Sequence, residues 1–383
     1  MPALLSLIVR CCALAVLISS QASAGQAPPV GTDLQTLNTM LGFLRNRNAE
    51  DYAISVPPGI DEARYVEIGG IEQWITIRGE DRRNPVLLFL HGGPGDATNP
   101  WGYAVFRSWL QTFTVVQWDQ RGSGRTLGRN GESSAAAVSV DRLVRDGILV
   151  AEHLRKSLGK DKIVLVGHSW GSMLGVFMVK ARPDLFSAFV GTGQVADPRR
   201  NYAVAYDELL RKARRVGEKR AERDLEAVGP PPYPDGGGYR IQRRWANLFE
   251  GADLFISAML GLALSAPGYT VRDVHDWGQG QMLSAERLVP ETSALEAKAL
   301  GGEFAIPVFV IQGAEDFTTP TTLAREFVSS IRAPRKEFAA IEGRGHFAVF
   351  TASEIFLKEI AARVLPTASR PSRGRAGSTK SRE

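Results

Sequence analysis

The chain contains 383 residues, of which 44% are hydrophobic and 23% are charged. Its length exceeds the ~100–200 residues of a typical domain, and its composition excludes a wholly disordered, collagen-like or multi-pass membrane chain. The formal net charge is +5, so nucleic acid or an anionic surface has to be considered as a partner until the basic residues are located.

Residues 1–24 have the pattern of a secretory signal peptide. Arg10 precedes the apolar run 11–18, and Ala22-Ser23-Ala24 supplies small residues at the spacing that a signal peptidase accepts. Because Arg10 interrupts the apolar stretch, too few residues remain for the ~20 of a spanning helix. We therefore expect cleavage after Ala24, export to the periplasm or the medium, and no stable membrane span in the mature chain.

The cysteines and the excess positive charge lie at the two ends of the chain. Cys11 and Cys12 belong to the signal segment, so disulfides, thiolate catalysis and Cys-based metal sites are not expected in the mature protein. Residues 366–383 are rich in Arg, Ser, Gly and Pro, which predicts a disordered basic tail. Elsewhere acidic and basic residues balance, so nucleic acid is not an expected partner and any attraction to an anionic surface is expected of the tail.

After an N-terminal extension (25–60), strands and helices alternate. Strands at 65–68 and 72–77 flank Gly69-Gly70 and predict a hairpin with a two-residue turn. Apolar runs rich in β-branched residues predict strands covered on both faces, and a helix precedes the last of them. These strands are at 86–90, 114–118 and 163–166, and the helix is at 140–158. The alternation predicts a mostly parallel sheet flanked by helices.

The alternation stops between residues 194 and 302 and then resumes. The interruption contains segments with helical spacing, broken by a Pro- and Gly-rich stretch, and predicts a helical cap. Its segment 254–264 is apolar all round but too short to span a membrane, so we expect a buried helix or a pocket lining. Two strands and two helices follow, at 308–312, 337–341, 321–331 and 350–364. We therefore predict an α/β core in two parts, 61–193 and 303–365, with the cap inserted between them.

A candidate nucleophile lies directly after the strand 163–166. In Gly167-His168-Ser169-Trp170-Gly171 the serine stands between a strand and a helix, which is the context that the Gly-x-Ser-x-Gly motif requires. The glycines relieve crowding at a strained turn that exposes the serine side chain. The alternative is a plain Gly-rich turn.

A serine hydroxyl needs a base to accept its proton, and the chain contains only five histidines. His91 and His168 lie inside Gly-rich turns, His153 lies in a helix, and His275 lies in the cap. His346 remains, in a loop after the last strand, where a base can reach the carboxyl ends of the sheet. The alternative for His346 is a structural loop histidine.

The third catalytic group should be a carboxylate on a loop between the nucleophile and the base. Asp316 fits, because it follows the strand 308–312 and precedes a helix. The adjacent Glu315 competes for the role, and Asp316 could instead cap the helix. We favour Asp316 from its position before Thr318-Thr319-Pro320, and we expect it to orient the imidazole and stabilise the imidazolium without taking the proton.

The oxyanion that forms on the substrate needs backbone N–H donors. His91-Gly92-Gly93-Pro94-Gly95 follows a strand and offers the N–H of Gly93 or, as the second choice, Gly92, and the N–H of Trp170 at a helix start is the other expected donor. No Gly-Lys-Ser/Thr follows these glycines, other glycines miss dinucleotide-binding spacing, and no His-Glu-x-x-His occurs. No cofactor or metal is therefore expected.

These motifs, together with Asp119-Gln-Arg-Gly-Ser-Gly124, resemble those of the proline iminopeptidase family of α/β hydrolases over residues 61–193 and 303–365. The resemblance implies an α/β-hydrolase fold with a Ser169-His346-Asp316 triad and a helical cap, and cleavage of an N-terminal residue, often proline, from small peptides. It also implies that Asp119 organises the loop beside the oxyanion hole.

The cap departs from the family pattern. Family members use cap glutamates to hold the substrate's amino group, and here the nearest segment, 243–250, lacks a clear match. Glu250 and Asp253 are the candidate substrate-binding residues, with Asp207 and Glu208 as further candidates.

Three functions are compatible with these residues. The leading hypothesis is an exported serine aminopeptidase that acts on short peptides or amino-acid amides through an acyl-enzyme. The alternative is a carboxylic-ester or lactone hydrolase with the same triad. The third is a catalytically silent binding protein, which the complete triad disfavours. Ser169 also argues against dehalogenase and epoxide hydrolase chemistry, because both need a carboxylate nucleophile. Oligomeric state is left open.

Overall fold

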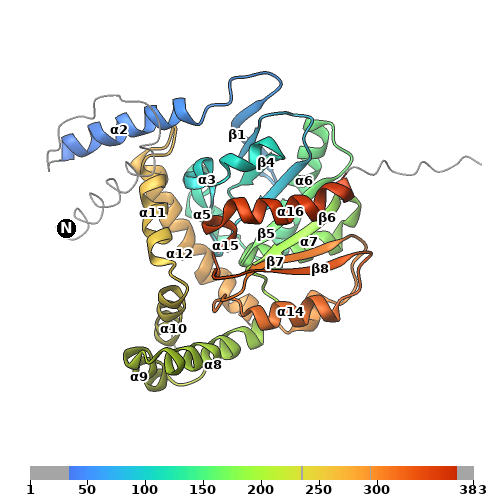
Figure 1. Cartoon of the computed structure of the whole chain (residues 1–383). Coiled ribbons are helices and arrows are strands. Elements are labelled where there is room, and N and C mark those ends of the chain that lie inside the picture. The colour runs from blue at the N-terminus through green and yellow to red at the C-terminus, as the bar shows by residue number, and fades with distance from the viewer. Residues whose placement is uncertain (1–33, 234–235, 294, 369–383) are drawn as a thin grey trace, which may run out of the picture.

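The computed structural model describes residues 34–233, 236–293 and 295–368 (Figure 1). The predicted signal peptide lies outside the described residues, as do residues 369–383 of the predicted tail. The first residues assigned to that tail, 366–368, instead complete the helix α16 (Ser353–Ala368).

In the described part of the chain, eight strands form one mostly parallel sheet, which confirms the predicted α/β-hydrolase fold class. Their order is β1-β2-β4-β3-β5-β6-β7-β8. The β1–β2 and β2–β4 pairs are antiparallel and all the other pairs are parallel. The strands are β1 (Ile60–Ile68), β2 (Ile71–Gly79), β3 (Val86–Leu90), β4 (Thr114–Trp118), β5 (Ile163–His168), β6 (Phe186–Thr192), β7 (Val308–Gly313) and β8 (Lys336–Ile341).

The predicted hairpin is present, with longer strands than the sequence indicated. Ile68 pairs with Ile71 across the turn, and Gly69 and Gly70 have φ values of 59° and 80°. A two-residue turn with positive φ at both positions matches the right-handed twist of the strands, and glycine adopts it without steric cost.

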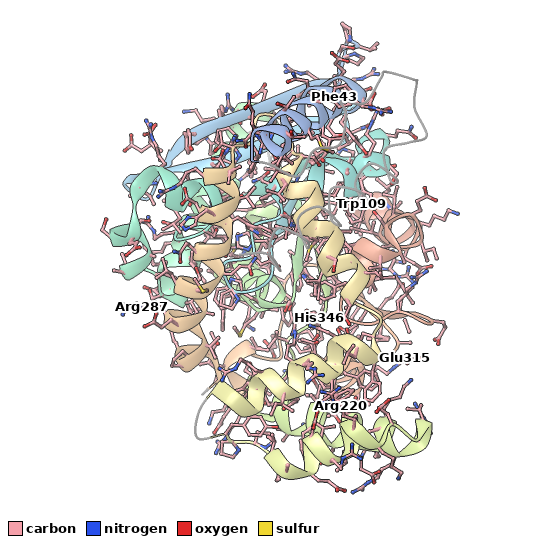
Figure 2. All side chains as sticks on the ribbon, turned by 90° about the vertical axis from the view of Figure 1, so that its left-hand side faces the viewer. Phe43, Trp109, Arg220, Arg287, Glu315 and His346 are labelled. Atoms are coloured by element: carbon pink, nitrogen blue, oxygen red, sulfur yellow. The ribbon has the colours of Figure 1, made fainter. Side chains whose placement is uncertain are left out.

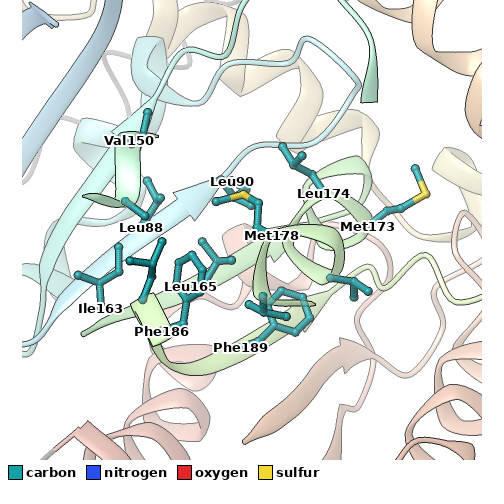
Figure 3. Packing of buried hydrophobic residues seen from close by; sticks show 14 of the residues in the cluster. Leu88, Leu90, Val150, Ile163, Leu165, Met173, Leu174, Met178, Phe186 and Phe189 are labelled. Carbon is teal, nitrogen blue, oxygen red and sulfur yellow. The ribbon is translucent and has the colours of Figure 1, made fainter. Parts of the chain in front are cut away.

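Helices cover both faces of the sheet. Alternate residues of β3 point to opposite faces, because the side-chain period of a strand is two. Leu88 and Leu90 pack into a core with α6 (Val140–Leu158), α7 (Trp170–Ala181) and α14 (Thr321–Ser330), part of which is drawn in Figure 3. Leu87 and Phe89 pack into a second core with α3 (Asn99–Val105), α15 (Ala348–Thr351) and α16.

The remaining helices of the core are short or peripheral. The N-terminal helix α2 (Leu34–Asp51) joins the second core through Leu41. Two further helices, α4 (Gly124–Asn130) and α5 (Glu132–Ala136), follow β4, and short 3₁₀ helices are formed by Arg107–Gln111 and Pro183–Leu185.

The described residues of the segment predicted as a cap form six helices between β6 and β7. They are α8 (Pro198–Val216), α9 (Lys219–Val228), α10 (Gly236–Phe249), α11 (Asp253–Leu264), α12 (Val271–Ser293) and α13 (Ala297–Leu300). In Figure 1, α8, α9 and α10 project below the sheet, and α11 and α12 run along its left side. The first three helices share a small apolar cluster that includes Leu209, Leu225 and Trp245, and Phe317 of the core joins it.

The helix α11 differs from the expectation for its apolar sequence. Leu254 is 76% exposed, whereas the carboxyl half of the helix is buried in the second core. Phe255 stacks on Phe350 with ring centroids 5.6 Å apart, so the helix is anchored on the core through one face. Within the described residues no single helix is long and apolar enough to cross a membrane, although the bent pair Gly237–Phe249 and Asp253–Leu264 together meets that length and composition.

Candidate active site

Ser169 occupies a strained turn between β5 and α7. Its φ and ψ are 54° and −121°, and it is the only non-glycine with positive φ in the described part of the chain. A side chain at Gly171 would lie 2.6 Å from the carbonyl oxygen of His91, and one at Gly167 would lie 2.8 Å from Cα of Ser172. The two glycines therefore allow close packing of strand and helix around the serine, as the motif requires.

His346 and Asp316 form a buried pair on the loops after β8 and β7. The Nδ1 atom of His346 lies 3.0 Å from Oδ2 of Asp316 and 3.2 Å from Oδ1. Asp316 also accepts hydrogen bonds from the backbone N–H groups of Thr318 and Thr319 and from the Thr319 hydroxyl, at 2.9, 2.7 and 2.8 Å. These contacts fix the carboxylate and place the proton on Nδ1, which leaves Nε2 as the basic atom.

The end of β6 brings this pair next to Ser169. The backbone N–H of Ser169 donates to the carbonyl of Thr192, at 2.9 Å. A side chain at the following residue, Gly193, would lie 2.8 Å from Cε1 of His346. The structure thus gathers Ser169, His346 and Asp316, predicted from three separate motifs, at the carboxyl ends of neighbouring strands.

Glu315 points away from this site. Its carboxylate pairs with Lys212 at 2.8 Å and is 46% exposed, whereas the side chain of Asp316 is fully buried. Figure 2 shows His346 in the interior and Glu315 at the edge of the molecule. Of the two adjacent carboxylates, only Asp316 contacts the imidazole.

The two histidines assigned to Gly-rich turns are buried and hydrogen-bonded. His91 donates from Nδ1 to the Gly92 carbonyl at 3.0 Å, and burial lowers its pKa to about 4. His168 donates from Nε2 to the His346 carbonyl at 3.0 Å, and burial lowers its pKa as well. Burial, followed by the charge of Arg243, also lowers the pKa of His346, so its imidazole is neutral at pH 7 and can accept a proton.

The predicted oxyanion donors lie around the nucleophile. Gly93 and Trp170 line the same pocket as Ser169, and Gly92 does not. Trp170 begins α7, where backbone N–H groups have no partner within the helix. Asp119 accepts from Asn99 at 2.7 Å and from the backbone N–H of Arg125 at 2.8 Å, which holds the neighbouring loop.

The pocket at Ser169 has a volume of about 120 Å³. Residues of α7, α8, α10 and α12 line it together with Thr318 and Thr319. No residue of α11 is part of this lining. Of the two alternatives for 254–264, a buried helix or a pocket lining, the structure supports the first for the carboxyl half of the helix and not the second. Among the described residues, Arg243 is the single charged residue of the pocket lining. The described lining therefore contains no carboxylate. The described residues also hold no group of three or more His, Cys, Asp or Glu placed to bind a metal ion.

Glu250, a predicted substrate-binding residue, contacts the catalytic loops instead of the pocket. Its Oε1 accepts the backbone N–H of Phe317 at 2.9 Å, and its Oε2 accepts the backbone N–H of His346 at 2.7 Å. Burial and the charge of Asp316 raise its pKa. Glu250 thus connects the end of α10 to both loops that carry the Asp316–His346 pair.

The other cap carboxylates lie elsewhere. Asp253 and Asp207 are exposed and do not line the pocket. Glu208 accepts a hydrogen bond from the Thr322 hydroxyl at 2.8 Å. The structure therefore brings none of the four candidates to the pocket lining.

Two site residues were not predicted from the sequence. The hydroxyl of Thr319 donates a hydrogen bond to Asp316, and its oxygen lies 3.2 Å from Nδ1 of His346. Its position three residues after Asp316 was the available signal. Arg243 lines the pocket from α10, and no local pattern distinguishes it from the adjacent Arg244.

Residues 85–353 match the α/β-hydrolase fold family, and the chain belongs to that family. The probable aminopeptidase YbaC of Bacillus subtilis is 30% identical over 291 residues, which cover 74% of this chain and 90% of that protein. The proline iminopeptidase of Neisseria gonorrhoeae is 32% identical over 132 residues, 34% of this chain and 39% of that protein. These relatives confirm the resemblance inferred from the motifs.

Solved structures show the same fold. The proline iminopeptidase-related protein of Thermus thermophilus superimposes with a TM-score of 0.55 at 23% identity, over 80% of this chain and 99% of that chain. The proline iminopeptidase of Mycobacterium smegmatis gives a TM-score of 0.51 at 20% identity, over 80% and 99%.

The two adjacent carboxylates should differ sharply in function. Asp316→Asn should lower kcat by roughly 10³–10⁴-fold, because an amide neither fixes the Nδ1–H tautomer nor stabilises the imidazolium. Glu315→Gln removes only an exposed ion pair and should change kcat by less than about fivefold. Steady-state hydrolysis measures both, and the opposite ranking would assign the catalytic carboxylate to Glu315.

Glu250→Gln should lower kcat by roughly tenfold or more with little change in KM. The amide NH₂ group must face one of the two backbone N–H groups, and an unpaired buried donor costs about 1–3 kcal/mol. Glu208→Gln is the matched control, because Glu208 also joins the cap to the core, through a hydrogen bond from the Thr322 hydroxyl and not from a catalytic loop N–H. A raised KM with unchanged kcat would instead show that Glu250 binds the substrate.

Proposed function

We propose that this chain is an exported serine aminopeptidase that releases N-terminal proline or another residue from short peptides. The observation that carries the proposal is the buried Asp316–His346 pair beside the strained Ser169. It is found in a chain 30% identical to a probable aminopeptidase over 90% of that protein's length.

The reaction would proceed through an acyl-enzyme. His346 takes the proton of Ser169 through Nε2 as the serine oxygen attacks the scissile carbonyl. The N–H groups of Gly93 and Trp170 stabilise the oxyanion. His346 then gives the proton to the leaving nitrogen, and a water molecule activated by the same imidazole hydrolyses the ester bond to Ser169. Asp316 stabilises the imidazolium in both steps.

A hydrogen-bond acceptor in the pocket wall supports an amide substrate. Asn201 lines the pocket, and its side-chain oxygen is buried without a partner among the described residues. Its Nδ2 donates to the Thr318 carbonyl at 2.7 Å, which fixes the orientation of the amide. A peptide brings N–H donors that can satisfy such an acceptor, whereas an ester bond brings none.

One observation favours the second candidate, a carboxylic-ester or lactone hydrolase. The described pocket lining contains no carboxylate to pair with the ammonium group of a peptide N-terminus, and both oxygens of Glu250 accept backbone N–H groups. An ester substrate does not need such a partner.

Export rests on the sequence pattern of residues 1–24. Sequencing the N-terminus of the mature protein from the exported fraction checks it, with Gly25 expected as the first residue and an intact Met1 contradicting it.

A substrate panel separates the two enzyme functions. We expect the wild type to hydrolyse prolyl or other aminoacyl arylamides, and Ser169→Ala to lose this activity by several orders of magnitude, because no other group can form the acyl-enzyme. Short-chain aryl esters are assayed in parallel. Ester turnover without arylamide turnover would overturn the aminopeptidase proposal, and activity that survives Ser169→Ala would overturn the triad.

A further inference from the structure

Arg243 is a cation without a partner at the active-site pocket. It projects from α10 and is the charged residue of the described lining. Within residues 34–233, 236–293 and 295–368 it makes no ion pair, whereas the nearby cap residues Arg200 and Lys212 pair with Glu326 and Glu315. The charge of Arg243 is therefore available to a ligand in the pocket.

The charge of Arg243 reaches the catalytic groups. Burial is the main cause of the lowered pKa of His346 and His168, and the charge of Arg243 lowers both further. The same charge opposes the rise in the pKa of Asp316 and Glu250 that burial causes. The guanidinium thus lies close enough to interact electrostatically with the catalytic groups.

The carboxylates near Arg243 are already engaged. Asp316 accepts from two backbone N–H groups, the Thr319 hydroxyl and His346. Glu250 accepts the backbone N–H groups of two loops. Asp96 accepts from the side chains of Trp277 and Gln281 at 3.1 and 3.0 Å. Both of these bonds fall on Oδ1 of Asp96, and none of the three carboxylates forms an ion pair with Arg243 within the described residues.

A guanidinium offers five N–H donors in a planar fork that matches the two oxygens of a carboxylate. We propose that Arg243 binds a carboxylate of the substrate, so that the enzyme prefers short substrates with a free carboxylate over their neutral analogues. If the enzyme is the proposed peptidase, this carboxylate is the C-terminus of a dipeptide. The identity of the carboxylate therefore rests on the proposed function.

The size of the pocket agrees with a short substrate. Its volume of about 120 Å³ is well below the ~300–1,000 Å³ of pockets that hold drug-sized ligands. In a dipeptide the C-terminal carboxylate lies one residue from the scissile bond, so a single pocket can hold both. A pocket with one cation and no carboxylate is also complementary to the acidic end of a peptide.

The test compares matched charged and neutral substrates in four proteins. The peptide pair is Pro-Ala and Pro-Ala amide, and the ester pair is 3-carboxyphenyl butyrate and 3-carbamoylphenyl butyrate. The proteins are the wild type, Arg243→Gln, Arg243→Lys and Arg244→Gln. Arg244 is the matched control, because it is the adjacent arginine of α10, is exposed as Arg243 is, lies over the Trp245 ring and does not line the pocket.

We expect the wild type to prefer the charged member of each hydrolysed pair by about 10- to 100-fold in kcat/KM, chiefly through KM, as for a charge-assisted hydrogen bond. Arg243→Gln should abolish this preference by lowering kcat/KM of the charged member more than that of the neutral member, and a far-UV circular dichroism spectrum and Tm matching the wild type would show that the variant is folded. Arg243→Lys should keep part of the preference, because a point charge cannot form the fork. Arg244→Gln should keep all of it.

The outcomes distinguish this inference from the proposed function. A preference that is equal in wild type and Arg243→Gln would overturn the role of Arg243, even if both hydrolyse Pro-Ala. An Arg243-dependent preference on the ester pair, with no turnover of either peptide, would support carboxylate binding and overturn the aminopeptidase proposal.

Discussion

The carboxylate of Glu250 is the contact on which the geometry of the site depends. It accepts backbone N–H groups from two loops, 67 and 96 residues further along the chain, and these loops carry Asp316 and His346. Asp96 makes the corresponding contact on the other side, because it joins the oxyanion loop to Trp277 and Gln281 of α12. The cap is thereby connected to both halves of the catalytic machinery.

These two contacts determine the charge that the pocket offers. Both oxygens of Glu250 and Oδ1 of Asp96 accept hydrogen bonds from the protein itself, and Arg243 is the one charged residue of the described lining. The helix α12 also packs closely against the core, since a side chain at Gly280 would lie 2.8 Å from Cα of Ser123. This close packing keeps the pocket narrow. A positively charged, narrow pocket is therefore a consequence of how the cap is attached.

The sequence predicted the features that depend on local patterns. Ser169, Asp316 and His346 each follow a strand. Because parallel strands run in the same direction, the positions after them lie at one edge of the sheet. The strand β6 was not predicted, because Ser187, Gly191 and Thr192 interrupt the apolar pattern of Phe186–Thr192. The burial of α11 was overestimated because an apolar sequence does not show which face meets the core. The partners of Glu250 were not predictable, since they are backbone groups brought together only by the tertiary fold.

The position of Glu250 also explains why an acidic residue in a cap is weak grounds for predicting a substrate amine. A buried carboxylate needs hydrogen-bond donors, and backbone N–H groups of neighbouring loops satisfy this need as well as a ligand does. Here a side chain at Gly345 would lie 2.7 Å from Oε2 of Glu250, so the backbone itself covers that oxygen. A substrate ammonium could reach it only by displacing the loop that holds His346, and recognition of the amine would then disturb the catalytic base. Binding the opposite end of the substrate through Arg243 leaves that loop in place.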